Sequence, residues 1–457
     1  MIYRFKKTLV LAQTALIITV SPIIAQAIDF RDKIRPFASP LIEDSIVVGM
    51  VIGIVKGNER QIIGYGIKSK KSNIPPDGKT LFEIGSTTKV FTGVVLADMV
   101  TRGEVRLETL VNDLLPAGVR LKDSAHPITL LHLTTHTSGL PRIMDLEPID
   151  VKNPYAGLTM EMLNEYLNGL TLQQVPGSYA YSNLGAGLLG NVLALKAGTS
   201  YEELVLKIIC QPLAMNDTRI VLNEEMESRL ATPYNDSLVE TSNWDILSLA
   251  GAGALRSTAE DLIKFARASM QYLKPPLGKA FKLSQMKQVD LGGGSAVGLG
   301  WHIYGDTLTH WHNGGTGGYA SYLSVNPESS LAVVILTNTA AYNQVTQLGH
   351  ELSQLLNGQD VNPPKRFLAV ALDEETLKSY VGEYEFRPGI VLTVTLAGGQ
   401  LLVQLTGQNS LPIFPFSETE FFCKVVDAQF TFVRNGEKKV TELILHQGGV
   451  DQKAVRK

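Results

Sequence analysis

A serine and a lysine three residues apart form the first pair in the sequence that could do chemistry. Ser86 and Lys89 open an apolar stretch that continues to Met99. If this stretch is a helix, both side chains lie on one face of its first turn. A desolvated lysine can be neutral and take the serine proton, while the helix dipole favours a developing oxyanion. Because Ser-x-x-Lys also occurs as a helix start beside a solvated lysine, further motifs are needed.

A second motif places a phenol and an amide at one turn. Tyr181 and Asn183 follow a loop with Pro176 and Gly177 and precede a helical pattern. A tyrosine beside cationic Lys89 can have its pKa lowered and act as general base, and the amide can hold a substrate carbonyl. Alone, the motif also fits a tyrosine packed on a helix start, with the asparagine as cap.

A third motif is rich in glycine and lies at the end of a predicted strand. His312 and Asn313 are followed by Gly314 and Gly315. Glycines let a substrate approach the backbone closely, and an edge strand can offer an N–H to an oxyanion. Alone, the segment also fits an ordinary glycine-rich hairpin.

The surrounding pattern predicts how these motifs are positioned. Apolar runs at 47–55 and 61–67 flank a Gly-Asn turn and predict a β-hairpin. Further strands are predicted at 301–304, 308–312, 319–325 and 331–337, and helices at 87–100, 130–136, 184–197, 259–272 and 344–356. We therefore expect one sheet whose strands come from both ends of a domain, with a large helical insertion between them.

The C-terminal part of the chain has a different pattern. Residues 357–365 are polar and contain Pro363-Pro364, which is typical of a linker. Short alternating runs then predict strands at 390–396, 400–405, 420–426, 429–433 and 440–446. We expect residues 366–457 to form a small all-β domain, similar to a barrel.

In this order and spacing, the three motifs resemble the serine β-lactamase and penicillin-binding protein superfamily, and most of all its branch of class C β-lactamases and D-Ala-D-Ala peptidases. Stretches 131–141 and 251–258 are also similar to this family. The resemblance implies an α+β domain over residues 28–356, with an antiparallel sheet, flanking helices and a large helical subdomain. The C-terminal module is similar to the small barrel appended to some members.

The resemblance also implies a role for each motif residue. Ser86 is acylated with help from Lys89 and Tyr181, and the backbone N–H groups of Ser86 and Gly315 hold the oxyanion. Asn183, His312 and Gly314 bind substrate, with His312 facing its carboxylate. The family often has Lys-Thr-Gly where this chain has His-Asn-Gly, and a histidine with a pKa of about 6.5 is largely neutral at pH 7. This difference argues against a specialised β-lactamase.

Several substrates remain open at this point. D-Ala-terminated peptidoglycan peptides and β-lactams are favoured, a class C-type β-lactamase or an esterase or amidase is the alternative, and a non-catalytic binding scaffold is a remote one. We expect no cofactor and no metal. His132 and His136, and likewise His310 and His312, have metal-ligand spacing, but no matching carboxylate or cysteine motif accompanies them.

The N-terminus predicts export. Arg4, Lys6 and Lys7 precede an apolar run over 8–24 and the small residues around Ala27. This order is typical of a secretory signal peptide over residues 1–27, cleaved after Ala27, and an uncleaved anchor is the alternative. We expect a periplasmic or secreted protein.

Composition excludes some partners. The formal net charge is only −3, and no cluster of lysines and arginines could follow a phosphate backbone, so we expect no nucleic-acid binding. Cys210 and Cys423 are far apart and predict small buried groups, although a bridge between them remains open. The oligomeric state is not determined by the sequence.

Overall fold

The computed structural model describes residues 29–457, except 123–125, 146–149, 173, 272–276, 305–307, 365–366, 368, 425 and 438. The predicted signal peptide lies outside the described residues. The helices are α1 (Arg31–Glu43), α2 (Thr88–Thr101), α3 (Leu130–Thr134), α4 (Met160–Gly169), α5 (Asn183–Ala197), α6 (Tyr201–Val205), α7 (Glu224–Arg229), α8 (Ala250–Gly253), α9 (Ala259–Gln271), α10 (Leu277–Gln285), α11 (Tyr342–Leu356) and α12 (Glu374–Tyr380).

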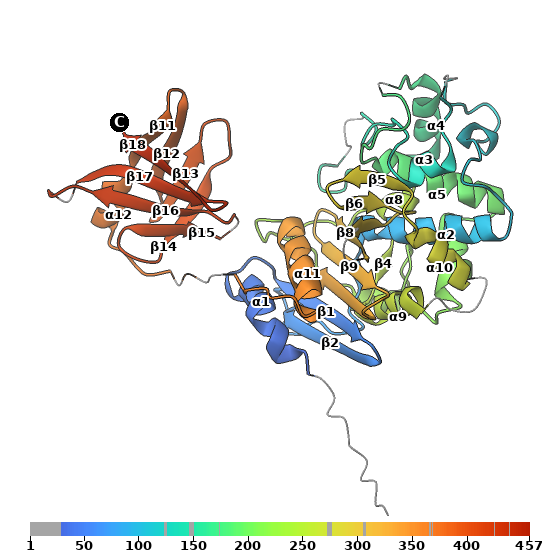
Figure 1. Cartoon of the computed structure of the whole chain (residues 1–457), viewed down its shortest axis with the longest axis horizontal. Helices are drawn as coiled ribbons and strands as arrows, with labels where there is room; N and C mark the ends of the chain where they lie inside the picture. Colours follow the sequence, from blue (N-terminus) through green and yellow to red (C-terminus); the bar gives the residue numbers. More distant parts are fainter. Residues whose placement is uncertain are drawn as a thin grey trace, which may run out of the picture.

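An antiparallel sheet of eight strands organises the larger domain. Its spatial order is β2-β1-β10-β9-β8-β7-β6-β5, so β1 from the start of the domain pairs with β10 near its end. Figure 1 shows these blue and orange segments side by side. The strands are β1 (Gly49–Lys56), β2 (Glu59–Gly66), β5 (Val289–Gly292), β6 (Ser295–Val297), β7 (His302–Tyr304), β8 (Thr309–Gly315), β9 (Ala320–Asn326) and β10 (Leu331–Thr337). The predicted hairpin, β1 with β2, is confirmed.

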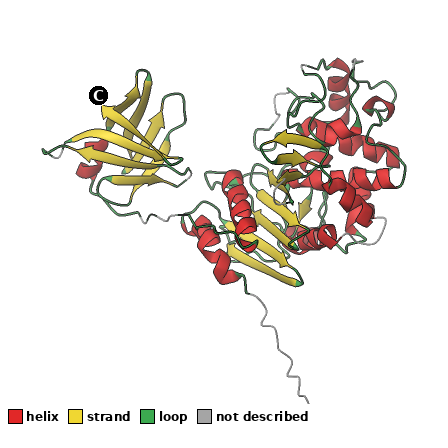
Figure 2. Ribbon diagram, in the orientation of Figure 1, coloured by secondary structure: helices red, strands yellow, loops and turns green. Residues whose placement is uncertain are grey.

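Both faces of the sheet are covered, which explains why its central strands are continuously apolar. On β1, Met50 and Ile52 belong to the core beneath α1 and α11. Val51 and Val55 belong to the opposite core, which includes α9 and the large helical region. The predicted α+β arrangement, with flanking helices and a helical subdomain, is confirmed, and Figure 2 shows helices on both sides of the sheet, most of them in the large helical region.

A closed barrel of eight strands follows the linker. Its strands are β11 (Gly382–Arg387), β12 (Ile390–Ala397), β13 (Gln400–Leu405), β14 (Leu411–Pro415), β15 (Glu420–Cys423), β16 (Gln429–Arg434), β17 (Val440–Gln447) and β18 (Val450–Arg456). Aromatic side chains fill its core, and the rings of Tyr380 and Phe432 lie 4.4 Å apart. The predicted barrel-like module is therefore a closed barrel with a packed interior.

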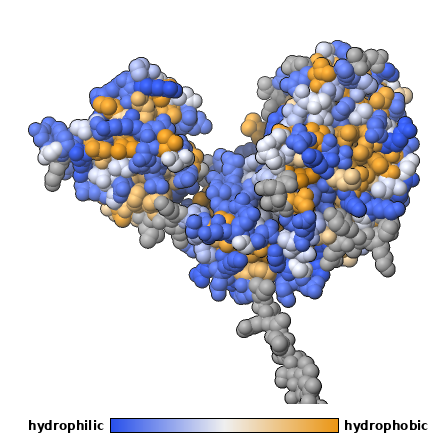
Figure 3. All heavy atoms as spheres, viewed as in Figure 1, coloured by the Kyte–Doolittle hydropathy of each residue, from blue (hydrophilic) through white to orange (hydrophobic). Residues whose placement is uncertain are grey.

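The surface and the cysteines are ordinary for a globular protein. On the face shown in Figure 3, exposed hydrophobic residues form separate patches among hydrophilic ones. Within the described part of the chain, no helix is long and apolar enough to cross a membrane. Cys210 and Cys423 are free thiols, each buried in a different core.

Candidate active site

Ser86 is the single accessible point on an otherwise buried segment. It lies in a 3-10 turn, Gly85–Thr87, that continues directly into α2. Every residue from Thr80 to Met99 is buried except Ser86, which is partly exposed. The predicted helix start is confirmed, because the serine lies at the N-terminus of α2 with its hydroxyl open to a cleft.

Lys89 lies beneath Ser86 in a cage of three oxygens. Its Nζ is 2.9 Å from Ser86 Oγ, 2.8 Å from Asn183 Oδ1 and 2.7 Å from the carbonyl oxygen of Ala252. Burial lowers the pKa of Lys89 well below its ordinary value, and the charge of Arg142 lowers it further. A neutral amine has two N–H donors and one lone pair. The two acceptor oxygens can take both donors, which leaves the lone pair for the Ser86 hydroxyl.

Tyr181 completes the group around the serine, but in a different protonation state from the one expected. Lys89 Nζ lies 5.0 Å from the centroid of the Tyr181 ring. Burial raises the pKa of the phenol, and a hydrogen bond with Ser86 opposes the rise only in part. The expectation that nearby cations lower this pKa is wrong, because desolvation outweighs them. Tyr181 is therefore a protonated phenol beside Ser86.

His136 holds Tyr181 in place. Its ring is 4.3 Å from the ring of Tyr181. Its Nδ1 accepts a hydrogen bond from the N–H of Ser182 at 3.2 Å, and its carbonyl accepts one from the N–H of Ala180 at 2.7 Å. Its φ of 58° is in the left-handed region, which non-glycine residues rarely adopt. In the sequence, His136 has metal-ligand spacing with His132 and lies in the family-like stretch 131–141, but neither signal predicts its contact with Tyr181.

The two histidines with metal-ligand spacing are engaged separately. Helix α3 ends at Thr134, so His132 and His136 do not share a helix as predicted. His132 accepts a hydrogen bond from the N–H of Thr129 in a capping box at the start of α3. Among the described residues, no group of three or more His, Cys, Asp or Glu side chains could hold a metal ion.

The glycines of the third motif let β8 approach the serine turn. A Cβ on Gly314 would lie 2.0 Å from the carbonyl oxygen of Ile84, and a Cβ on Gly85 would lie 2.7 Å from the nitrogen of Gly315. Strand β7 pairs with β8 only as far as Trp311, so among the described strands none pairs with Asn313–Gly315 on the side away from β9. The backbone of Gly315 is therefore adjacent to the turn that carries Ser86.

His312 is buried and is not the exposed, charged group that was expected, although its ring centroid lies 6.3 Å from that of Tyr181. The residue is 1% exposed, and its Nε2 is buried without a hydrogen-bond partner. Its Nδ1 lies 2.5 Å from the carbonyl oxygen of Asn313, which fixes the proton on Nδ1. Burial lowers its pKa well below the ordinary value. His312 is thus a neutral, buried ring that offers no charge to a carboxylate.

A small pocket opens directly beside Ser86. Its volume is about 30 Å³, and its lining includes Asn183, Tyr155, Trp244 and Ile246. Such a space accepts a group of one or two heavy atoms. The motif serine and amide therefore meet an apolar and aromatic wall that the sequence analysis did not identify.

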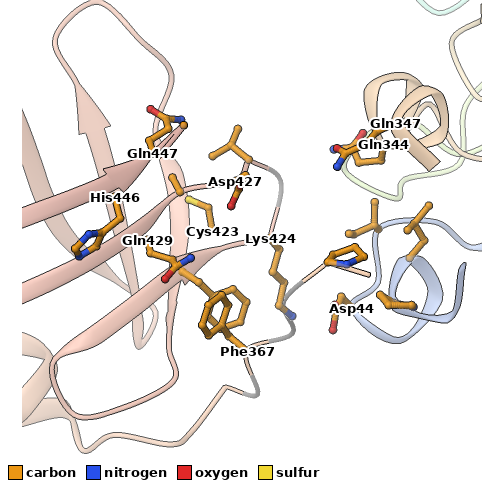
Figure 4. Close-up of a pocket in the computed structure, with 18 of the residues that line it drawn as sticks. Asp44, Gln344, Gln347, Phe367, Cys423, Lys424, Asp427, Gln429, His446 and Gln447 are labelled. Atoms are coloured by element: carbon orange, nitrogen blue, oxygen red, sulfur yellow. The ribbon is translucent and has the colours of Figure 1, made fainter. Parts of the chain in front are cut away.

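A larger cavity lies away from this chemistry. Figure 4 shows residues of the barrel, including Cys423 and His446, and residues of α11, including Gln344, around a space of about 600 Å³. Burial raises the pKa of the Cys423 thiol to about 11, so it is a poor nucleophile. Size alone does not identify the reactive site, and the buried lysine beside Ser86 distinguishes the smaller pocket.

Comparison with known proteins agrees with this geometry. A profile described as "Beta-lactamase" matches residues 34–356, and one described as "Domain of unknown function (DUF3471)" matches residues 368–455. The chain is 27% identical over 441 residues to penicillin-binding protein 4* of Bacillus subtilis (strain 168), covering 89% of this chain and 94% of that protein. It is 26% identical over 361 residues to the D-alanyl-D-alanine-carboxypeptidase/endopeptidase AmpH of Escherichia coli (strain K12), and the similarity covers 73% of this chain and 90% of that protein.

A solved structure is also similar. The crystal structure of a β-lactamase/D-alanine carboxypeptidase from Yersinia pestis, complexed with citrate, has a TM-score of 0.64 and 25% identity. The similarity covers 72% of this chain and 99% of that one. Because the first profile spans well over half of the chain, the protein belongs to the β-lactamase family.

Proposed function

We propose that this serine hydrolase is exported and acts on peptidoglycan peptides, from which it removes D-alanyl residues or which it cleaves after such residues. β-Lactams acylate the enzyme, and the acyl-enzyme is hydrolysed slowly. One observation carries the proposal: buried Lys89 donates to Asn183 Oδ1 and to the Ala252 carbonyl while it lies 2.9 Å from Ser86 Oγ. This arrangement prepares a neutral amine to take the serine proton.

The reaction then follows in two balanced steps. Ser86 Oγ attacks the substrate carbonyl as Lys89 takes its proton, and the N–H groups of Ser86 and Gly315 hold the oxyanion. The bond from carbon to the leaving nitrogen breaks, and Tyr181, itself reprotonated from Lys89, gives that nitrogen its proton. Water attacks the acyl-Ser86 ester in the second step and returns the proton to the serine. Asn183 orients the substrate amide in both steps.

Three features support D-alanyl substrates. The pocket beside Ser86 has room for a methyl group but not for a large side chain. Two relatives are named for D-alanyl or D-alanine carboxypeptidase activity. The neutral, buried His312 in place of a lysine argues against a specialised β-lactamase. Export is supported by the predicted signal segment and by the relatives' names as penicillin-binding proteins and peptidases.

Intact mass of the full chain with benzylpenicillin and with a D-Ala-D-Ala peptide tests the proposal. We expect a slowly decaying penicillin adduct and turnover of the peptide. Both should be absent in Ser86→Ala and retained in the matched control Ser178→Ala, which changes an exposed serine. Rapid release of penicillin would instead indicate a β-lactamase, and an adduct that persists in Ser86→Ala would contradict the site.

A further inference from the structure

Arg142 is a cation at the cleft that the sequence analysis did not single out. Its guanidinium carbon lies 5.1 Å from the centroid of the Tyr181 ring. Its carbonyl accepts hydrogen bonds from the N–H groups of Asn183 at 2.8 Å and Leu184 at 3.3 Å. The backbone of Arg142 is thus fixed to the start of α5, where the substrate-binding amide lies, while its side chain is exposed.

The charge of Arg142 affects the pKa of three tyrosines that come from separate parts of the chain. Burial raises the pKa of Tyr155, Tyr179 and Tyr342, and the guanidinium opposes the rise in each. No carboxylate in the described part of the chain pairs with Arg142. The guanidinium near the Tyr181 ring is thus exposed and has no carboxylate partner among the described residues, so it is available to a ligand.

Two other basic groups near the serine, Lys89 and His312, are not accessible to a substrate carboxylate. Lys89 is buried and surrounded by three oxygens of the protein itself. His312 is 1% exposed, and its free Nε2 does not reach solvent. Arg142 is therefore an exposed cation beside Tyr181 that a substrate in the cleft can reach.

We propose that Arg142 binds the carboxylate on the leaving-group side of the substrate and so takes the part that the sequence assigned to His312. The inference rests on the proposed function and names the substrate class of the same site: acyl compounds whose leaving group ends in a carboxylate. The leaving nitrogen must approach the Tyr181 hydroxyl to receive its proton. In a terminal amino acid the carboxylate is one carbon from that nitrogen, so it lies near the guanidinium above the Tyr181 ring. The planar fork of arginine can hold it by two hydrogen bonds.

A matched pair of substrates tests the inference. Both are N-acyl-D-alanyl thioesters; one has a thioglycolate leaving group with a free carboxylate, and the other has its methyl ester. We expect Arg142→Gln to lower kcat/KM about 10- to 100-fold on the carboxylate and less than about threefold on the ester, because one charge-assisted interaction is lost. Arg142→Lys should recover part of the loss. The exposed Arg60→Gln, on β2, is the charge-matched control and should change neither value.

Each remaining outcome has a definite meaning. Equal losses on both thioesters, or no loss on either, would overturn the inference, as would a carboxylate-selective loss in His312→Gln with Arg142→Gln unaffected. Turnover of the methyl ester by Arg142→Gln shows that the variant is folded. If the wild type hydrolyses neither thioester and forms no adduct at Ser86, the proposed function itself fails, and the inference fails with it.

Discussion

His136 contacts the ring of Tyr181 and binds the backbone of the residues before and after it, Ala180 and Ser182. The centroids of the His136 and Tyr181 rings are 4.3 Å apart, with the rings tilted. His136 Nδ1 accepts a hydrogen bond from the N–H of Ser182, and its carbonyl accepts one from the N–H of Ala180. The φ of 58° at His136 is sterically unfavourable, so this backbone conformation is maintained by its surroundings. A strained residue directly behind a proposed proton donor is a positioning residue.

Changing His136 should affect the rate more than substrate binding. We expect His136→Gly, which relieves the backbone, to remain folded but to lower kcat about 10- to 100-fold with KM nearly unchanged, because the phenol loses its alignment. His136→Asn tolerates the same φ and can accept the Ser182 N–H, so it should recover part of the rate. Steady-state kinetics and melting temperatures check this. A change in KM alone would contradict a positioning role.

Lys89 should set the pH dependence of both stability and acylation. Its folded pKa is lowered, so between that pKa and about 10.4 the unfolded chain binds one more proton, and the free energy of unfolding rises with pH over this window. We expect Lys89→Met to be inactive but more stable at pH 7 by about 1–2 kcal/mol. This difference in the free energy of unfolding should shrink towards about pH 10, where Lys89 is also deprotonated in the unfolded chain. Urea unfolding at several pH values measures it, and a less stable Lys89→Met at pH 7 would contradict a desolvated lysine.

Tyr181 should act as an acid that stays protonated. Because burial raises its pKa above the ordinary value, kcat/KM should form a plateau above the Lys89 ionisation and show no rise from phenolate formation up to about pH 9. Tyr181→Phe should lower acylation by about two to three orders of magnitude and keep the same acid limb. A rate that increases together with tyrosinate absorbance would show that the phenolate is the base instead.

Gly314 tests the close approach of β8 to the serine turn. A Cβ there would lie 2.0 Å from the Ile84 carbonyl oxygen and 2.5 Å from Ser321 Oγ. We expect Gly314→Ala to lower the free energy of unfolding by about 3 kcal/mol and to reduce acylation, since Ser86 and Gly315 must separate. Gly169→Ala, where a Cβ meets open space, should change stability by less than about 1 kcal/mol. Similar stabilities for both variants would contradict the predicted clash.

Local signals explain what the sequence could predict about the fold. The Gly-Asn turn specifies the hairpin of β1 and β2, and the continuous apolar run at 331–337 predicts β10 because both faces of that strand are buried. Short or half-exposed elements were not predicted, including β5 and the proline-containing α1. Strand β5 has only four residues and α1 contains Pro36 and Pro40, so neither gives a local signal strong enough to predict it.

For the site, the sequence determined which groups are available: Ser86 and Lys89 one turn apart on a helix, a tyrosine and an amide before another helix, and glycines at a strand end. Burial depends on the complete packing and was decided only by the tertiary structure. The packing raises the pKa of Tyr181 through desolvation, buries His312, and leaves Arg142 exposed beside Tyr181. The pKa and the burial of each side chain depend on all of its neighbours, which come from distant parts of the chain. The spacing of residues along the sequence therefore does not encode them.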